Sequence, residues 1–450
     1  MSTDEYRMEN DFLGRVKVPA TALYGGHTQR ARNNFPLKGE RSIGHYPSLI
    51  EALLRVKHAA AEANYKAHFL NHRISHAIIQ GSEDLIGQRA YQHFPVHRLH
   101  GGGGTSANMN VNEVLANCAE EHCGGRRGEY RWVHPNDHVN LHQSSNDVYP
   151  TACHMAIISR WPLLSCALGQ LRQTLQAKVS QFRHEPRIAR TCLQDAVSVT
   201  FGDLFGSYEA LIARSHDRIT RAVEVLHAVN LGGTIVGRTL DVPDGYRQRI
   251  IPILQEVTRD ADYYLADNLF DAAQNPDSLV AVSGALELLA RALIKIAKDL
   301  RLLSSGPETG LGELKLPAVQ PGSSIMPGKV NPVIPEFVVQ CSFQVIGNHV
   351  ASVTSVDHGE LDLNVWKSVP LFNILDSMEL LSNAIVTLVK LCVKDLAVVK
   401  ERGVQNISTL IPLLTNLMKS RGYSSVSKIY QEAAGDGPRI RSLLEEKGWI

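Results

Sequence analysis

The sequence predicts a mainly α-helical protein. Apolar residues recur at alternating spacings of three and four in several long segments, whereas segments with the period of a β-strand are sparse. The clearest stripe runs from Leu286 to Leu303, similar stripes occupy 157–175 and 374–392, and a weaker one occupies 212–226. Such narrow stripes specify long helices that pack at shallow angles. We therefore expect a long central helical bundle.

Each stripe has to be covered by other helices. A single chain can close such a bundle on itself, but helices this long with few connecting loops favour a bundle completed by other subunits. Pro162 lies in the first turns of the 157–175 pattern and is expected to kink or delay that helix.

The character of the sequence changes twice along the chain. Residues 1–140 mix short helical patterns with turns rich in His, Gly and Pro, residues 141–395 carry the long stripes, and residues 396–450 hold shorter segments. We expect an N-terminal domain, a central helical domain and a small C-terminal helical domain with these boundaries.

Composition excludes several classes of protein. Among 450 residues, 46 are basic and 45 acidic, a net charge of +1 that points neither to nucleic acid nor to a membrane surface. Apolar residues make up 44% and charged residues 20%, a globular balance. The polar N-terminus, the lack of a long apolar run and seven cysteines without a CxxC pair favour a soluble, cytoplasmic protein with reduced thiols.

The most unusual polar segment is GSSIMPGKVNPVIPE, residues 322–336. Its glycines permit a loop that opens and closes, Ser323 and Ser324 offer hydroxyls, and Lys329 and Asn331 offer a cation and an amide. Pro332 suits the first turn of a following helix, whose N-terminus favours an anion. A flexible, anion-binding lid is the functional interpretation; a plain surface loop is the alternative.

Three further segments interrupt the apolar pattern. GGGGTSANMNVNE (101–113) lets the backbone approach a ligand closely but lacks the GK[ST] of a P-loop. HPNDHVNLHQSSNDVYPTA (134–152) places Ser144, Ser145 and Asn146 before a helix, where helix capping alone would also explain them. RTCLQDAV (190–197) offers Thr191 and Cys192.

Together these hydroxyls, amides and the lid lysine suit a small dicarboxylate. No dinucleotide fingerprint, zinc spacing or GxSxG nucleophile turn is present. His134 and His138 have the spacing of a metal pair, but Pro135 between them favours a turn. We expect no metal and no cofactor.

The chain resembles the aspartase/fumarase superfamily. The resemblance runs from YGGHTQRARNNFP (24–36) to about residue 395, and its most specific motif is GSSIMPGKVNP, supported in order by GTSANMNVNEVLAN, HPNDHVN with SSND, RTCLQDA and DLRLLSSGP. NPVIPE, FQVIGN and LDLNVW are closer to aspartate ammonia-lyases than to fumarases. The tail after 395 matches loosely.

The resemblance implies a homotetramer whose central bundle contains about twenty helices, with active sites shared by three subunits. It also implies reversible elimination from a succinate skeleton to give fumarate and a leaving group. A proton leaves the carbon beside one carboxylate, which becomes a doubly charged aci-carboxylate. A serine can take that proton only if its alkoxide is stabilised.

By the same resemblance, Ser323 would be the base, and Lys329 with Asn331 would bind the carboxylate next to the leaving group. The other carboxylate would be bound by hydroxyls, those of Thr105, Ser144, Ser145 and Ser324. Asn146 and Thr191 would contact the leaving amino group, beside Cys192. Glu336 would have a supporting role, and Leu361 or Leu363 would line the pocket.

The departures from the family lie mainly near the leaving group. Cys192 stands where fumarases and many aspartases have a histidine, the partner of Glu336 in handling water. Hydroxide needs proton assistance to leave, whereas a protonated amine leaves as neutral ammonia, so Cys192 weighs against a fumarase. His27, His100, the Leu141–His142 pair, Arg238 and Asp241 also differ from the family's usual residues.

The favoured function is therefore an aspartate ammonia-lyase, a carbon–nitrogen lyase. The alternatives are a lyase acting on an N- or S-substituted succinate or aspartate, a fumarase, and a non-catalytic structural relative. An intact Ser323, Lys329 and Asn331 argues against the last of these.

Overall fold

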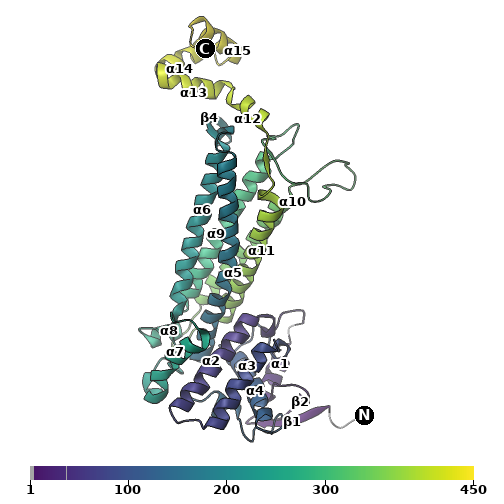
Figure 1. Ribbon diagram of the computed structural model, residues 1–450, viewed down its shortest axis with the longest axis vertical. Helices are drawn as coiled ribbons and strands as arrows, with labels where there is room; N and C mark the ends of the chain where they lie inside the picture. Colours follow the sequence, from purple (N-terminus) through teal and green to yellow (C-terminus); the bar gives the residue numbers. More distant parts are fainter. Residues whose placement is uncertain (1–4, 37) are drawn as a thin grey trace. The chain divides into compact units, whose positions relative to one another are not determined.

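The computed structural model describes residues 5–36 and 38–450. The prediction of a mainly helical protein is confirmed (Figure 1). The chain forms two compact units. The first comprises Met1–Ser165, Asp217–Leu288 and Phe343–Leu380, and the second comprises Cys166–His216, Leu289–Ser342 and Leu381–Ile450. The division into three domains expected from the sequence remains a prediction.

The α-helices of the described residues are α1 (Gly26–Asn34), α2 (Pro47–Lys66), α3 (His72–Gly87), α4 (Thr105–His122), α5 (Ser145–Gln181), α6 (Phe201–Glu224), α7 (Asp244–Thr258), α8 (Leu269–Gln274), α9 (Asp277–Leu303), α10 (Val333–Val356), α11 (Ser368–Leu388), α12 (Lys400–Ile407), α13 (Leu410–Arg421), α14 (Tyr423–Glu432) and α15 (Gly437–Glu446). None of them is long and apolar enough to cross a membrane.

The described strands pair only in twos. β1 (Tyr6–Asp11) with β2 (Gly14–Pro19), β3 (Pro186–Thr191) with β4 (Gln194–Thr200), and β7 (Leu314–Lys315) with β8 (Ala397–Val398) are antiparallel, and β5 (Ala228–Val229) with β6 (Tyr264–Leu265) is parallel. Short helical turns complete the description: η1 (Ile43–His45), η2 (Tyr91–His93), η3 (Pro135–Val139), η4 (Val225–His227), η5 (Thr239–Asp241) and η6 (Val389–Val393).

The four predicted apolar stripes lie mainly in α5, α6, α9 and α11, and each of these helices, like α10, belongs to both units. In α9 every stripe position from Leu286 to Leu303 is 5% exposed or less. Burying a leucine or isoleucine side chain stabilises a fold by about 1.5–3 kcal/mol, so this one stripe is a large contribution.

One of the two effects expected of Pro162 does not occur. Pro162 does not delay α5, because the helix begins at Ser145 and runs through both Pro150 and Pro162. The expected kink stays a prediction. A proline inside a helix removes one backbone hydrogen bond. The packing of fully buried Leu164 and Leu168 on the following turns offsets that loss.

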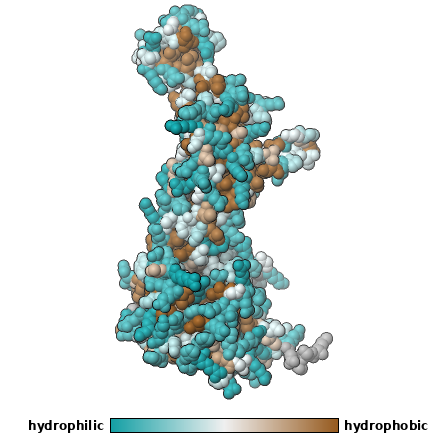
Figure 2. Space-filling model, in the orientation of Figure 1, coloured by the Kyte–Doolittle hydropathy of each residue, from teal (hydrophilic) through white to brown (hydrophobic). Residues whose placement is uncertain are grey.

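The long helices also expose apolar side chains. Leu163 of α5, Leu302 of α9, and Phe343 and Val350 of α10 are 44% to 60% exposed. Figure 2 shows apolar residues, in brown, at the surface of these helices. Apolar side chains exposed singly are normal on a monomer, whereas a contiguous apolar patch is typical of an interface between proteins.

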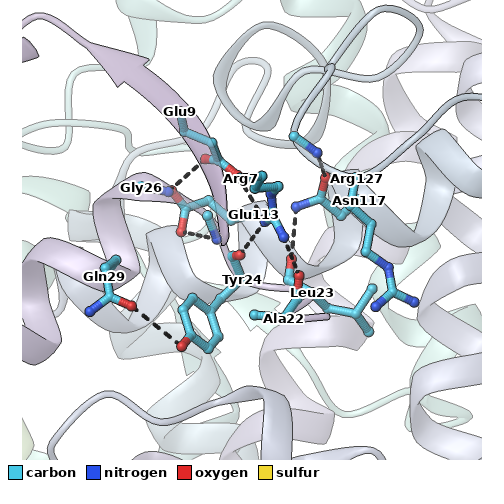
Figure 3. Close-up of polar contacts among 12 residues, drawn as sticks. Arg7, Glu9, Ala22, Leu23, Tyr24, Gly26, Gln29, Glu113, Asn117 and Arg127 are labelled. Atoms are coloured by element: carbon cyan, nitrogen blue, oxygen red, sulfur yellow. Dashed lines mark hydrogen bonds and ion pairs between the residues drawn. The ribbon is translucent and has the colours of Figure 1, made fainter. Parts of the chain in front are cut away.

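In the first unit, buried carboxylates hold the N-terminal segment to α4 (Figure 3). Glu113 of α4 accepts backbone N–H bonds from Gly25, His27 and Thr28 at 2.7 to 3.0 Å. Glu9 of β1 accepts one from Gly26 at 2.7 Å. These bonds satisfy N–H groups at the start of α1, which helix geometry leaves without partners.

The second unit contains the β3–β4 hairpin, which contacts α12 and α13. Beyond it, α13, α14 and α15 enclose a small core of their own, formed by Leu414, Val426, Ile429, Ala433, Ile440, Leu443 and Leu444. Asp436 caps α15 by accepting a hydrogen bond from the backbone N–H of Arg439.

Candidate active site

The glycine run ends where α4 begins. Gly102, Gly103 and Gly104 have φ angles of +87°, +61° and +97°, which a residue with a Cβ adopts only with strain. Thr105 is the first residue of α4. The run therefore turns the chain into α4, and the backbone N–H of Thr105 donates to the carbonyl of Gly102 at 3.0 Å.

The predicted SSN segment lies at the start of α5, which begins two residues earlier than expected. Ser144 precedes the helix, while Ser145 and Asn146 are its first two residues. Ser144 Oγ accepts the backbone N–H of Asn146 at 3.2 Å, so helix capping accounts for part of this motif. The hydroxyl hydrogen of Ser144 remains a possible donor to a ligand.

A side-chain bond joins the first turns of α4 and α5. Asn108 Nδ2 donates to Ser145 Oγ at 3.0 Å. Two helix N-termini are thereby held next to each other, and each carries partial positive charge. With the hydroxyls of Thr105 and Ser144, this arrangement can bind a carboxylate.

Asn146 and Asp147 connect this cluster to the 230–235 loop. Asn146 Nδ2 donates to the carbonyl of Ile235 at 2.9 Å, and Asn230 Nδ2 donates to the carbonyl of Asn146 at 3.1 Å. Asp147 accepts backbone N–H bonds from Ser144, Gly232 and Thr234. Burial raises the pKa of Asp147 to about 6, although these three bonds act in the opposite direction.

A buried lysine lies behind the cluster. Lys57 of α2 is 0% exposed, and its Nζ donates to Asn140 Oδ1 and Gln143 Oε1, both at 2.9 Å. Asn140 Oδ1 also accepts from Asn108. Burial lowers the pKa of Lys57 to about 7. The sequence analysis did not identify this residue.

Of the two pocket leucines, Leu363 lies nearer the cluster. A Cβ added to Gly103 would stand 3.7 Å from Leu363 Cδ2, so the leucine packs against the glycine run. Leu361 is 92% exposed and has a positive φ angle of 49°.

Thr191 and Cys192 lie at the tip of the β3–β4 hairpin in the second unit. Cys192 and Leu193 form the turn with φ angles of +52° and +61°, unusual for residues other than glycine. Cys192 is exposed. At the base of the turn, Arg190 pairs with the fully buried Glu313 at 2.6 Å and fixes the hairpin against β7.

The lid segment has no regular secondary structure and is closed at its base. The backbone N–H of Gly322 donates to the carbonyl of Lys329, and Asn331 Nδ2 donates to the carbonyl of Gly322, both at 2.8 Å. Within the loop, Ser323 Oγ accepts the backbone N–H groups of Ile325 and Met326 at 3.2 and 3.0 Å. Ser324 and Lys329 are exposed or half-buried. Pro332 directly precedes α10, as its position in the sequence indicated.

Glu336 lies in the first turn of α10 and has a partner that the sequence did not reveal. Its carboxylate pairs with Arg301 of α9 at 3.2 Å. A guanidinium stays charged near neutral pH, so Arg301 holds this carboxylate by charge rather than by proton exchange.

The histidines that depart from the family's residues are packed. His142 Nδ1 lies 2.7 Å from Asn64 Oδ1, and its ring contacts Phe69. The His100 ring is 7% exposed and lies against Tyr149. Burial lowers the pKa of His27, His100 and His142, so these rings favour the neutral form. Arg238 and Asp241 are 3.8 Å apart.

His134 and His138 flank a single π-helical turn, η3. His138 Nδ1 accepts the backbone N–H of His134 at 2.9 Å. His134 Nδ1 in turn lies 3.3 and 3.2 Å from the backbone nitrogens of Asn136 and Asp137. One ring nitrogen of each histidine therefore forms hydrogen bonds within the turn, which agrees with the turn expected from Pro135.

The structure brings together Thr105, Ser144, Ser145 and Asn146, with Leu363 nearby, in the first unit. Ser323, Ser324, Lys329 and Asn331 share the lid of the second unit, which also carries Thr191, Cys192 and Glu336. Sequence reasoning missed Lys57, Asn108, Asn140 and Asp147. The available signal for Lys57 was a lysine inside the apolar stretch from Leu49 to Ala63.

Comparison with known proteins identifies the family. A family model described as "Lyase" matches residues 14–347. The chain belongs to this family, the aspartase/fumarase superfamily of lyases. The resemblance stated from the motifs, and the fold that it implied, are therefore confirmed.

Relatives of this lyase carry two kinds of name. An aspartate ammonia-lyase of Pseudomonas fluorescens is 41% identical over 450 residues, which cover 100% of this chain and 94% of the relative. A class II fumarate hydratase of Chlamydia pneumoniae is 42% identical over 445 residues, 99% of this chain and 96% of the relative. Both names are those of lyases.

Among solved structures, a protein titled fumarate lyase:delta crystallin from Brucella melitensis, bound to cobalt, superposes with a TM-score of 0.94. It is 41% identical and covers 98% of this chain and 96% of its own. The prediction of an enzyme, and of a carbon–nitrogen lyase, agrees with these findings.

Proposed function

We propose that this lyase converts L-aspartate reversibly to fumarate and ammonia. The first-unit cluster of Thr105, Ser144 and Ser145 would bind the carboxylate that becomes doubly charged. Lys329 and Asn331 of the lid would bind the other carboxylate, and Asn146 and Thr191 would orient the amino group. The identity to an aspartate ammonia-lyase along the whole chain supports this substrate.

The observation that carries the proposal is the environment of Ser323. Two backbone N–H groups point at its Oγ, from Ile325 and Met326. Hydrogen bonds donated to an oxygen favour its anionic form, so they stabilise the alkoxide that a serine base requires. The alkoxide takes a proton from the carbon next to the carboxylate, and the aci-carboxylate forms. Its electrons then form the carbon–carbon double bond as the protonated amine leaves as neutral ammonia.

The leaving group distinguishes the alternatives. Cys192 is exposed at the hairpin tip, and Glu336 is paired with Arg301, so neither resembles a histidine–glutamate pair that protonates hydroxide. This favours an amine over hydroxide, and therefore aspartate or an N-substituted aspartate over malate. The relative from Chlamydia pneumoniae is named a fumarate hydratase, so fumarate hydration is the second candidate function.

We also propose that the protein assembles as a homotetramer with active sites shared by three subunits. The exposed apolar side chains of α5, α9 and α10 support it, since further subunits would cover them. The small-dicarboxylate substrate is the expected ligand, with no nucleic acid or membrane partner.

Absorbance of fumarate tests the function directly. Purified protein is mixed separately with aspartate, malate, and N- and S-succinyl compounds. We expect fumarate from aspartate, and a Ser323→Ala variant that retains its assembly but loses turnover by about 10²- to 10⁴-fold, the usual contribution of a positioned base. Ser442→Ala, at a half-buried serine of α15 that bonds Glu446, is the matched control and should keep full activity.

Malate turned over faster than any aspartate would overturn the choice of leaving group. Turnover by Ser323→Ala close to the wild-type rate would overturn the choice of base. Release of fumarate from none of these compounds would support a non-catalytic relative.

A further inference from the structure

Lys57 is a buried cation without an ion pair in the described part of the chain. It lies on α2 between fully buried Val56 and the half-buried His58, and it is itself 0% exposed. Its bonding partners are the side-chain oxygens of Asn140 and Gln143. The acid whose charge reaches it, Asp147, has its oxygens occupied by backbone N–H groups. Burying a charge without a counter-charge is unfavourable, so a compensating function is expected.

The hydrogen bonds of Lys57 determine how the side-chain amides of Asn140 and Asn108 are oriented. An ammonium group only donates, so Asn140 has to present its Oδ1 to Lys57. Asn108 must then present its NH₂ group to the same oxygen, and it does so at 3.1 Å. The other N–H of Asn108 is directed at Ser145 Oγ, 3.0 Å away.

This direction determines what Ser145 can do. Because its Oγ accepts from Asn108, its own hydrogen points away from Asn108 and is available to a ligand. The arrangement has a cost that shows in the structure: Asn108 is 1% exposed, and its Oδ1 has no hydrogen-bond partner among the described residues. A freely rotating amide would avoid leaving that oxygen unpaired.

We propose that Lys57 is a positioning residue for the carboxylate that becomes doubly charged. Through Asn140 and Asn108 it fixes Ser145 as a hydrogen-bond donor to that carboxylate, and its charge balances the second negative charge of the aci-carboxylate. This inference rests on the proposed function, whose carboxylate cluster it deepens. The lowered pKa of Lys57, about 7, is consistent with a cation that lacks its anion in the free enzyme.

Two ligands separate this role from simple stabilisation of the fold. Succinate carries two ordinary carboxylates. The nitronate form of 3-nitropropionate replaces one of them with a planar group that has two oxyanions on a positively charged nitrogen, and it imitates the shape and the oxygen charges of the aci-carboxylate. Calorimetric binding of both is measured with the assembled wild-type enzyme and with Lys57→Met. We expect the affinity for the nitronate to fall by about 100-fold and that for succinate by less than about 10-fold, because electrostatic preorganisation acts mainly on developing charge.

Turnover should change in the same sense. In Lys57→Met, kcat falls by about 100-fold while KM changes by less than about 10-fold. Lys178→Met is the matched control, since Lys178 is also buried and its Nζ donates to Gln181 Oε1 and to the carbonyl of Leu396. It removes a buried ammonium from the second unit and should leave kcat and nitronate affinity unchanged.

Asn108→Leu tests the relay even if Lys57→Met fails to fold. Leucine keeps the branched shape of asparagine and removes both donated bonds, so the nitronate affinity should again fall by about 100-fold. Equal losses for nitronate and succinate, or a Lys57→Met enzyme with wild-type kcat, would overturn the role of Lys57 and leave the proposed function intact. A wild-type enzyme that binds neither ligand would overturn both proposals.

Discussion

Buried ionisable side chains set the electrostatics of the first unit. Lys57, Glu113 and Asp147 are almost completely buried, and burial moves the pKa of each toward its neutral form, to about 7, about 7 and about 6. Lys57 and Asp147 adjoin the carboxylate cluster, whereas Glu113 holds the N-terminal segment to α4. Of these three residues, only Lys57 and Asp147 are therefore expected to affect catalysis.

Glu113 gives a stability prediction with a definite sign. Burial raises its pKa from 4.5 to about 7, so between these values the folded protein holds a proton that the unfolded chain releases. The stabilisation from that proton is complete below 4.5 and is lost as pH rises toward 7. We expect Glu113→Gln to lack this dependence, a difference in slope of up to about 1.4 kcal/mol per pH unit.

Urea denaturation of wild type and Glu113→Gln at several pH values across this window measures the difference. Comparing the two proteins cancels the titration of all other groups. Parallel stability curves would show that Glu113 titrates normally in the folded protein.

Cys192 gives a prediction about the leaving group. In wild type, kcat/KM for malate should be at least about 100-fold below that for aspartate, because no positioned acid protonates the leaving hydroxide. Cys192→His introduces a titratable ring at the hairpin tip and should raise malate dehydration, while Cys192→Ser, which cannot act in this way near neutral pH, should not. Equal malate activity in both variants would show that residue 192 does not handle the leaving group.

At the residue scale, the sequence predicted the hydroxyls of the candidate site better than it predicted the residues that hold them in place. Ser144 and Ser145 lie at a helix N-terminus, as the capping preference indicated, and Thr105 begins α4, a helix start that the glycine run did not predict. Lys57 bonds Asn140, 83 positions along the chain, so its position inside an apolar stretch could mark it as buried but could not place it beside the site. The pairing of Arg301 with Glu336 likewise depends on the packing of α9 beside α10.

At the scale of elements, helices were predictable and short strands were not. The stripe from Leu286 to Leu303 lies within α9, because apolar residues spaced three and four apart over a long segment form one face of an α-helix. The β3–β4 hairpin has Cys192 and Leu193 in its turn, and neither is a residue that favours a positive φ angle. Tertiary contacts, including that of Arg190 with Glu313, hold that turn, so the local sequence does not predict it.

The glycine run gives a prediction at this scale. Gly104 has a φ of +97°, and a Cβ on it would lie 2.4 Å from Tyr149 Cδ1, a ring that is fully buried. Gly104→Ala should therefore lower the free energy of unfolding by about 2–4 kcal/mol and displace Thr105, which weakens succinate binding.

Gly102→Ala is the matched control. Gly102 also has a positive φ, +87°, but the nearest atom to its added Cβ is 3.9 Å away. Gly102→Ala introduces the backbone strain without the clash and should lower the free energy of unfolding by only about 1 kcal/mol. Urea denaturation and calorimetry compare the two, and equal effects would show that Tyr149 yields to the new methyl group.

At the scale of the whole molecule, the two groups of site residues belong to different compact units. The carboxylate cluster lies in the first unit, and the lid and hairpin lie in the second. The family resemblance implies that a complete site takes these groups from different subunits. The exposed apolar residues of the long helices supply a reason for the subunits to associate, since covering them removes apolar surface from water.

Hybrid tetramers test this sharing. Ser323→Ala lacks the base and Ser145→Ala lacks a carboxylate ligand, so each variant alone should have little activity. If a site takes Ser323 from one subunit and Ser145 from another, random mixing of the two variants leaves both residues intact in roughly a quarter of the sites. Co-expression of differently tagged variants, followed by isolation of the hybrids, should therefore restore about a quarter of wild-type turnover. If both residues came from the same subunit, every site would lack one of them and no activity would return. Light scattering on the same hybrids checks the assembly, and a fully active monomer would contradict both the tetramer and the shared site.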